Sequence, residues 1–123
     1  MKMTVLEGKF VVCRLDCEDV IPNWVDTKSF ISITRTEAEL SIVCADKNVP
    51  DNIKCEKEWK ALKVEGPLDF SLIGILAKIS SLLAEEKISI FAISTFDTDY
   101  ILLKEENLGD AIKVLTMNGI DIN

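Results

Sequence analysis

The sequence predicts an α+β fold of the ferredoxin-like kind. This prediction rests on the order of the helices and strands expected in its second half. A strand-like run over Trp59–Glu65 is followed by an apolar helix pattern, two Ile-rich strands joined by a tight turn, and a second amphipathic helix. With a short last strand, this is the split β-α-β pattern. The 123 residues suffice for one compact domain or for two very small modules sharing a core.

The first helix follows the break at Gly66-Pro67. Asp69 is placed to cap it, and the pattern continues to Glu86. Apolar residues recur at i, i+3, i+4 and i+7, which predicts one broad buried face. This face consists of Leu72, Ile75, Leu76, Ile79, Leu82 and Leu83.

The remaining elements of the second half follow closely. Strands are expected over Ile88–Thr95 and Tyr100–Lys104, with a turn between them. Asn107 is a suitable N-cap for the second helix, and Gly119 is placed to end it in a left-handed conformation. The apolar face of this helix consists of Leu108, Ala111, Ile112 and Leu115. Only Ile120–Asn123 remains for a last short strand.

The first half resembles a degenerate copy of the second. Without a gap, Ser32–Val43 aligns with Ala92–Leu103, and two acids, Glu37 and Glu39, then coincide with acids of the second hairpin. A dozen residues with matching apolar positions favour a structural repeat. The sequence therefore predicts two tandem modules, residues 1–57 and residues 58–123, with the first one degenerate.

The connections of the first half are shorter. A strand is expected over Lys9–Leu15, and the segment from Cys17 to Lys28 has room for only a turn or two of helix around Val20–Val25. Asp51–Glu58 can form a short helix or link the two modules.

Charge and composition limit the possible partners. The net charge is −7, which disfavours nucleic acid and anionic membrane surfaces as partners. Apolar runs are too short for a membrane span, and the start of the chain has no long apolar stretch of a signal peptide. We therefore expect a cytoplasmic protein.

The composition disfavours catalysis by a histidine base and the binding of a metal ion. The chain contains no histidine, which removes the commonest general base and metal ligand. The cysteines are Cys13, Cys17, Cys44 and Cys55, without a C-x2-C pair, so free thiols are favoured over a metal site or a disulfide. We expect no enzyme activity, no metal and no cofactor.

Two segments together suit a small zwitterion. A helix start directly after Gly66-Pro67 offers unpaired backbone N–H groups and the positive end of a helix dipole. Asp97 and Asp99 offer negative charge at a turn between two apolar strands. The helix start can hold the carboxylate of an amino acid, while Asp99 and Thr95 hold its ammonium group.

These same segments, Val64–Leu76 and Ile88–Leu102, resemble the ACT domain family of small ligand-binding modules that regulate amino-acid metabolism. Such modules occur in aspartate kinases and resemble those of eukaryotic arginine sensors. The resemblance covers Glu58 to the C-terminus well and Lys9–Asp46 more weakly. It implies a βαββαβ fold, amino-acid binding at the interface between ACT units, and a homodimer.

The resemblance also implies ligand contacts from the start of the first helix and from the second strand with its turn. Carried onto this sequence, the ligand-binding residues are Asp69, Phe70, Ser71, Leu72, Ile73, Gly74, Ser94, Thr95, Asp97 and Asp99.

Several of these residues also have a structural explanation. The hydroxyls of Ser94 and Thr95 can be satisfied by hydrogen bonds within the sheet. Asp69 can simply cap the helix, and Gly74 can allow close helix–strand packing. Asp97 suits a turn, and Asp99 can be a structural carboxylate. Two alternative functions follow: a protein-interaction module that has lost its ligand, and an enzyme that uses Asp97, Asp99 and the Cys17 thiol.

Overall fold

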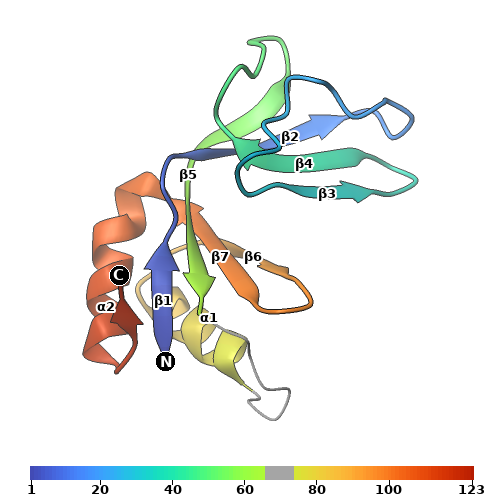
Figure 1. Cartoon of the computed structure of the whole chain (residues 1–123). Coiled ribbons are helices and arrows are strands. Elements are labelled where there is room, and N and C mark those ends of the chain that lie inside the picture. The colour runs from blue at the N-terminus through green and yellow to red at the C-terminus, as the bar shows by residue number, and fades with distance from the viewer. Residues whose placement is uncertain (66–73) are drawn as a thin grey trace. The chain divides into compact units, whose positions relative to one another are not determined.

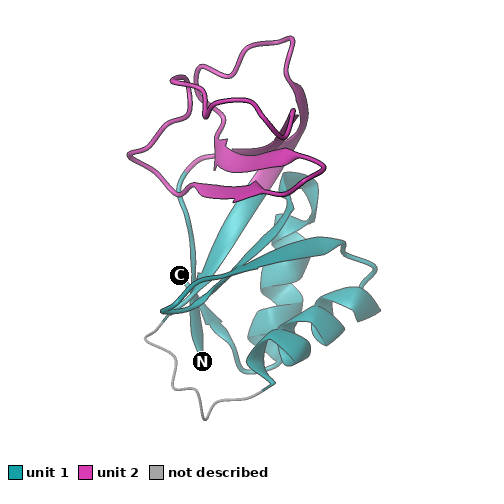
Figure 2. Cartoon of the chain, turned by 90° about the vertical axis from the view of Figure 1, so that its right-hand side faces the viewer, with its two compact units in different colours: residues 1–7, 60–123 teal, residues 8–59 magenta. Residues whose placement is uncertain are grey.

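The computed structural model describes residues 1–65 and 74–123 (Figure 1). Its contacts divide the chain into two compact units (Figure 2). Unit 1 comprises residues 1–7 and 60–123, and unit 2 comprises residues 8–59. Strand β5, Lys54–Val64, contributes its first part to unit 2 and its second part to unit 1.

Unit 1 contains a mixed sheet in the order β8-β1-β5-β7-β6. Two helices lie on the same side of this sheet (Figure 2). The elements besides β5 are β1 (Lys2–Val5), α1 (Ile75–Glu85), β6 (Ile90–Ser94), β7 (Asp99–Lys104), the 3-10 turn η1 (Glu105–Asn107), α2 (Leu108–Met117) and β8 (Asp121–Ile122). The α+β class expected from the sequence is confirmed.

Strand β1 is an element that the sequence did not reveal. It pairs antiparallel with β5, where Met3 faces Val64, and parallel with β8, where Met3 faces Ile122. Residues 1–7 therefore lie with unit 1, whereas the sequence grouped them with the first module. The division into modules 1–57 and 58–123 stays a prediction. Four residues with one buried side chain carry too little periodicity to be recognised as a strand.

The core of unit 1 joins both helices to the sheet. Its buried side chains come from strands β1, β5 and β7, from both helices, and from one residue that follows each helix. They are Met3, Leu62, Val64, Ile79, Leu83, Ile88, Ile101, Leu103, Ala111, Leu115 and Ile120. The expected helical faces supply Ile79 and Leu83 from α1 and Ala111 and Leu115 from α2, which confirms the apolar periodicity.

The two helices end in the same way. After α1, the N–H of Ile88 donates to the carbonyl of Leu83 at 3.0 Å, and Lys87 between them has φ 60°. After α2, the N–H of Ile120 donates to the carbonyl of Leu115 at 3.1 Å, and Gly119 has φ 85°. Both ends are Schellman motifs. The role of Gly119 is confirmed, and α1 ends with a lysine at the equivalent position.

This difference predicts a stabilising substitution. Lys87→Gly is expected to raise the free energy of unfolding by about 0.5–1 kcal/mol, because glycine adopts a left-handed conformation without the steric cost of a Cβ. Gly119→Ala is expected to lower it by about 1 kcal/mol for the same reason. Urea denaturation of both variants measures the two shifts. Equal shifts in one direction would contradict this explanation.

The start of α2 differs from the expectation. Asn107 occupies the N-cap position, but its backbone is helical and its side chain makes no capping hydrogen bond. The turn η1 leads into the helix and places Asn107 in a continuous helical path. The expected cap is therefore wrong, because an N-cap side chain reaches the first N–H groups from an extended backbone.

Unit 2 is an antiparallel sheet in the order β3-β4-β2-β5. Its remaining strands are β2 (Phe10–Leu15), β3 (Ser32–Arg35) and β4 (Leu40–Ala45). Residues 8–59 are all described and contain no helix, so the short helix expected around Val20–Val25 is wrong. Turns replace it, and Trp24 and Val25 of this segment pack against the buried side chains of the sheet.

The segment Asp51–Glu58 is neither a helix nor a plain link. Strand β5 begins at Lys54 and pairs with β2 through Arg14–Lys54, Cys13–Cys55 and Val12–Glu56. The register then shifts, and Glu58 adopts φ 68° beside this irregularity. A β-bulge with one residue in a left-handed conformation explains why the strand alternation is interrupted here.

The hairpins β3–β4 and β6–β7 share their turn geometry, but with an offset different from the gapless alignment. The N–H of Thr36 donates to the carbonyl of Glu39, and the N–H of Thr95 donates to the carbonyl of Thr98. Thr36 therefore corresponds to Thr95, one residue away from the expected match. The expected correspondence of Glu37 and Glu39 with the acids of the second hairpin is therefore wrong, because a shift of one residue moves every side chain to the other face of a strand.

Candidate functional site

Four of the expected ligand-binding residues lie at the turn end of the β6–β7 hairpin in unit 1. Ser94 ends β6, Asp99 begins β7, and the two residues are paired across the strands. Thr95 and Asp97 belong to the turn between them. The structure therefore brings Ser94, Thr95, Asp97 and Asp99 together in one short segment.

The hydrogen bonds of the turn occupy the Thr95 hydroxyl. It donates to the carbonyl of Thr98 at 3.0 Å and accepts from the N–H of Thr98 at 3.2 Å. The backbone N–H of Thr95 donates to the same carbonyl at 2.8 Å. This hydroxyl holds the turn in shape, so a ligand would meet a preformed loop.

The Asp99 carboxylate is held from the opposite strand. The hydroxyl of Ser94 donates to Asp99 Oδ1 at 2.5 Å, and Asp99 is half-buried. Its neighbours along β7 include the fully buried Ile101, Leu102 and Leu103. A carboxylate fixed by one hydrogen bond at the end of an apolar strand keeps its second oxygen for a cation or a further donor.

Thr98 is a residue that the sequence reading treated only as part of the turn. It is 4% exposed, and its hydroxyl donates to the carbonyl of Val64 at 2.5 Å, which ties the turn to strand β5. Local spacing in the sequence gives no signal for this bond, because Val64 lies 34 residues away along the chain.

Thr98→Val is expected to lower the free energy of unfolding by about 1–3 kcal/mol, because the buried Val64 carbonyl loses its donor without a change in side-chain volume. Thr36→Val is the comparison: Thr36 corresponds to Thr95, and its exposed hydroxyl bonds within the β3–β4 turn, without a buried partner. Thermal denaturation of both variants measures the difference. Equal losses would show that turn geometry alone, and not the buried bond, carries the effect.

The other expected ligand contacts are mostly outside the described residues. This holds for Asp69, Phe70, Ser71, Leu72 and Ile73. Gly74 is described and occupies the N-cap position of α1 with φ 82°. The helix therefore begins at Ile75, and the expected start with Asp69 as its cap is wrong. A Cβ added at Gly74 would meet no atom within 4 Å, so close helix–strand packing is wrong as its explanation. The left-handed conformation accounts for this glycine.

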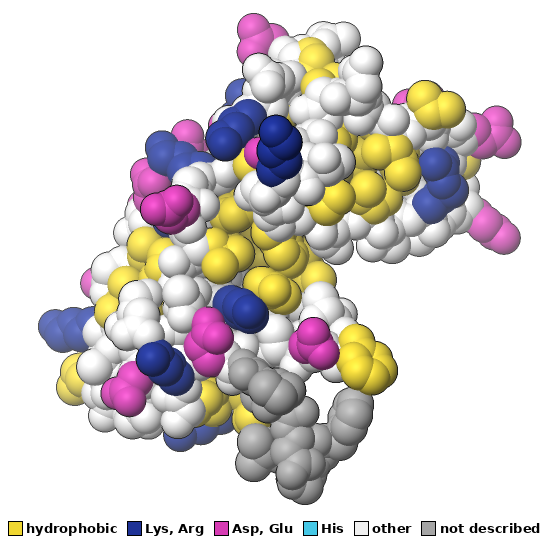
Figure 3. Space-filling model, viewed as in Figure 1, with side chains coloured by type: hydrophobic (Ala, Val, Ile, Leu, Met, Phe, Trp, Pro, Cys, Tyr) yellow, Lys and Arg dark blue, Asp and Glu magenta, His cyan; other side chains and the backbone are white. Residues whose placement is uncertain are grey.

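Charges are mixed over the molecule. On the face shown in Figure 3, basic and acidic side chains of the described residues are interspersed, without one extended basic area. None of the described helices has the length and apolar character needed to cross a bilayer. Within residues 1–65 and 74–123, no group of three or more cysteine or acidic side chains is arranged to hold a metal ion.

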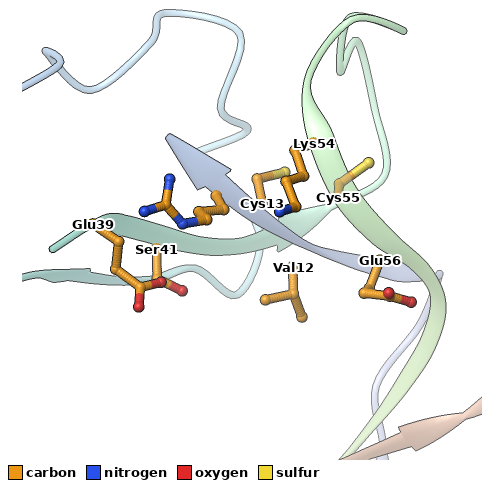
Figure 4. A pocket seen from close by; sticks show the side chains of 8 residues that line it. Val12, Cys13, Glu39, Ser41, Lys54, Cys55 and Glu56 are labelled. Carbon is orange, nitrogen blue, oxygen red and sulfur yellow. The ribbon is translucent and has the colours of Figure 1, made fainter. Parts of the chain in front are cut away.

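Unit 2 has a groove that the sequence reading missed (Figure 4). It has a volume of about 170 Å³. Its charged lining comes from strands β2 and β5 and from the turn before β4, with Arg14, Lys54, Glu56 and Glu39. The Arg14 guanidinium also donates to the carbonyl of Ala38 at 2.9 Å. These residues are far apart in the sequence, so only the strand pairing reveals that both signs of charge line one groove.

Three of the four cysteines cluster in unit 2, and two of them, Cys13 and Cys55, also line this groove. Cys13 and Cys44 belong to the core of unit 2, and Cys55 packs against it. A hydrogen bond with Cys44, together with burial, raises the pKa of the Cys13 thiol. Burial raises the pKa of Cys55 as well. The thiols of Cys13 and Cys55 are therefore mostly protonated at neutral pH. All four cysteines are free.

The comparisons with known proteins agree with this architecture. The family model described as the ACT domain matches residues 54–117, slightly more than half of the chain. The chain belongs to the ACT domain family. A second model, for an N-terminal domain, matches residues 8–52.

Similar proteins include one of defined biological role. The human cytosolic arginine sensor for mTORC1 subunit 1 is 33% identical over 95 residues, which are 71% of this chain but 29% of the sensor. The chain thus spans less than a third of the curated relatives it matches. Its ACT domain is related to amino-acid-sensing regulatory modules.

Solved structures share the fold. The crystal structure of protein Atu0741 from Agobacterium tumefaciens has a TM-score of 0.94 and 35% identity, with 99% of this chain and 91% of that chain covered. Aspartokinase III of Escherichia coli, in complex with aspartate and ADP, has a TM-score of 0.68 and 10% identity. That comparison covers 95% of this chain and 33% of the kinase, and it shows the common fold alone.

Proposed function

We propose that the chain is a non-catalytic regulatory module that binds a small amino acid at an interface between ACT modules. The family and the relationship to an amino-acid sensor support this proposal. In it, the backbone N–H groups around Phe70–Ile73 and Gly74 hold the carboxylate of the ligand, with Asp69 beside them. The β6–β7 turn, with Ser94, Thr95 and Asp97, surrounds its cationic end.

Asp99 is the residue that carries the proposal. Its carboxylate is half-buried and fixed at one oxygen by Ser94, and so it is preorganised for a cation. An ammonium or guanidinium group that meets the second oxygen forms a charge-assisted hydrogen bond, which is stronger than a neutral one. The Thr95–Thr98 bonds keep the adjoining turn in a single shape.

The first experiment is a thermal-shift panel of the twenty amino acids, with arginine first because the human relative is named an arginine sensor. A ligand at about 100 times its dissociation constant stabilises the folded state by about 2.7 kcal/mol, which is several degrees for a chain of this size. A panel without any response would overturn the proposal.

The site is then tested by substitution. Asp99→Asn is expected to abolish the response to the ligand, because the amide carries no charge and presents donors of its own. Asp51→Asn, in an exposed turn of unit 2, is the matched control and should retain the full response. Equal responses of both variants would show that Asp99 does not contact the ligand.

A protein-interaction module is the second candidate, and Phe96 favours it. This aromatic side chain is 89% exposed at the tip of the β6–β7 turn, which is unusual for a large apolar residue without a partner.

We also propose that the chain forms a homodimer in the cytoplasm. Sedimentation velocity of the wild type and of Phe96→Ser distinguishes a dimer that uses this tip from one that does not.

A further inference from the structure

The three clustered thiols of unit 2 differ in how they are paired. Cys13 on β2 lies directly opposite Cys55 on β5, as partners in the antiparallel register. Cys13 lies opposite Ile42 on β4, so Cys44 is its diagonal neighbour, two residues along that strand. Figure 4 shows Cys13 and Cys55 pointing to the same side of the sheet, next to each other.

Direct and diagonal neighbours have different distances. Directly opposite residues in antiparallel strands have Cα atoms about 4.5 or 5.5 Å apart, depending on the type of pair, and both values lie within the range of about 4.4–6.8 Å that disulfides require. Diagonal neighbours lie about 7–8 Å apart, outside this range. Of the two contacts of Cys13, only that with Cys55 suits a covalent bond.

We propose that Cys13 and Cys55 are a redox-active pair that hydrogen peroxide converts into an intramolecular disulfide. Cys55 is the entry point, because it is half-exposed whereas Cys13 and Cys44 are buried. Cys44 contacts Cys13 through a hydrogen bond and remains a thiol.

The reaction balances with peroxide as the only oxidant. Because the pKa of Cys55 is raised, the reaction proceeds through its small deprotonated fraction. The Cys55 sulfur attacks one peroxide oxygen, the O–O bond breaks, and the leaving hydroxide takes up a proton to form water. The deprotonated sulfur of Cys13 then attacks Cys55 Sγ in the resulting sulfenic acid, the S–O bond breaks, and a second water forms. The two thiols together lose two electrons and two protons, and the peroxide accepts them.

The bond would join β2 to β5 at the centre of the unit 2 sheet. Residues 13 and 55 are separated by most of unit 2, so the link closes a long loop and restricts the unfolded chain. The expected consequence is an increase in melting temperature of about 5 °C or more that dithiothreitol reverses.

The test uses the full reduced chain treated with hydrogen peroxide. We expect the number of titratable thiols to fall from four to two, with the loss of two hydrogen masses and no covalent dimer. Peptide mapping should identify a Cys13–Cys55 link. Cys55→Ser should abolish the intramolecular link, whereas Cys17→Ser, outside the cluster, should retain it. Both variants leave the two buried cysteines in place, and circular dichroism checks that they fold.

Three results would overturn the proposal. The first is that four thiols remain titratable after treatment, and the second is a gain of oxygen mass without a crosslink. The third is a link that includes Cys17 or Cys44, because the strand register excludes the diagonal pair.

Discussion

Replacing Leu103 with alanine is expected to lower the free energy of unfolding by about 2–5 kcal/mol. Leu103 is fully buried on β7 and belongs to the same cluster as Leu83 of α1 and Leu115 of α2. The truncation removes apolar surface from the core and leaves a cavity between the sheet and both helices. A sheet and two helices that pack on each other can close such a cavity only in part.

Urea denaturation followed by circular dichroism measures this loss. Met117→Ala is the matched control, because Met117 is 76% exposed at the end of α2, and its truncation should change stability by less than about 0.5 kcal/mol. A loss below about 1 kcal/mol for Leu103→Ala would mean that α1 and α2 do not depend on β7 for their packing.

The second half of the fold was predictable because its periodicity is strong. Both helices carry apolar residues at helical spacing, and Ile79, Leu83 and Leu115, which this spacing predicts to be buried, are buried in the structure. Helix ends were predictable where glycine marked them, as at Gly119. Lys87, which adopts the same conformation at the end of α1, gave no such signal.

The first half was less predictable because tertiary contacts determine it. Val20–Val25 carries apolar residues, but Val20 is exposed and only Val25 is buried, so one face never forms. Strand β1 forms because β5 and β8 supply partners for four residues of weak pattern. The sequence also does not reveal the strand register. The turns at Thr36 and Thr95 correspond in the structure, but an alignment shifted by one residue matches the apolar positions equally well.

In the candidate site, too, some residues could be located from the sequence and others only from the structure. Turn residues and Asp99 could be located from the sequence, because an acid between a turn and an apolar strand is unusual. The partner of Asp99, Ser94, and the anchor Thr98 follow from strand pairing and hydrogen bonds across the hairpin. The thiol cluster and the charged groove of unit 2 combine residues from separate strands, which sequence spacing alone does not bring together.

Leu40→Ala is the second substitution with a large expected effect, about 2–5 kcal/mol, and its effect should be concentrated in unit 2. Leu40 is fully buried at the start of β4 and pairs with Leu15 and Arg35. Its cluster contains six buried residues, against eleven described in unit 1, and unit 2 contains no helix. One leucine therefore supplies a larger share of the apolar burial that holds unit 2 together.

Hydrogen exchange of the backbone amides tests where the loss occurs. We expect β2, β3 and β4 to lose protection in Leu40→Ala while α1 and α2 keep theirs, because local opening follows the weaker cluster. Ile33→Ala, on the neighbouring strand and 37% exposed, is the matched control with an expected loss below about 1 kcal/mol. Uniform loss of protection in both units would contradict this result and would mean that strand β5, which both units share, makes them unfold together.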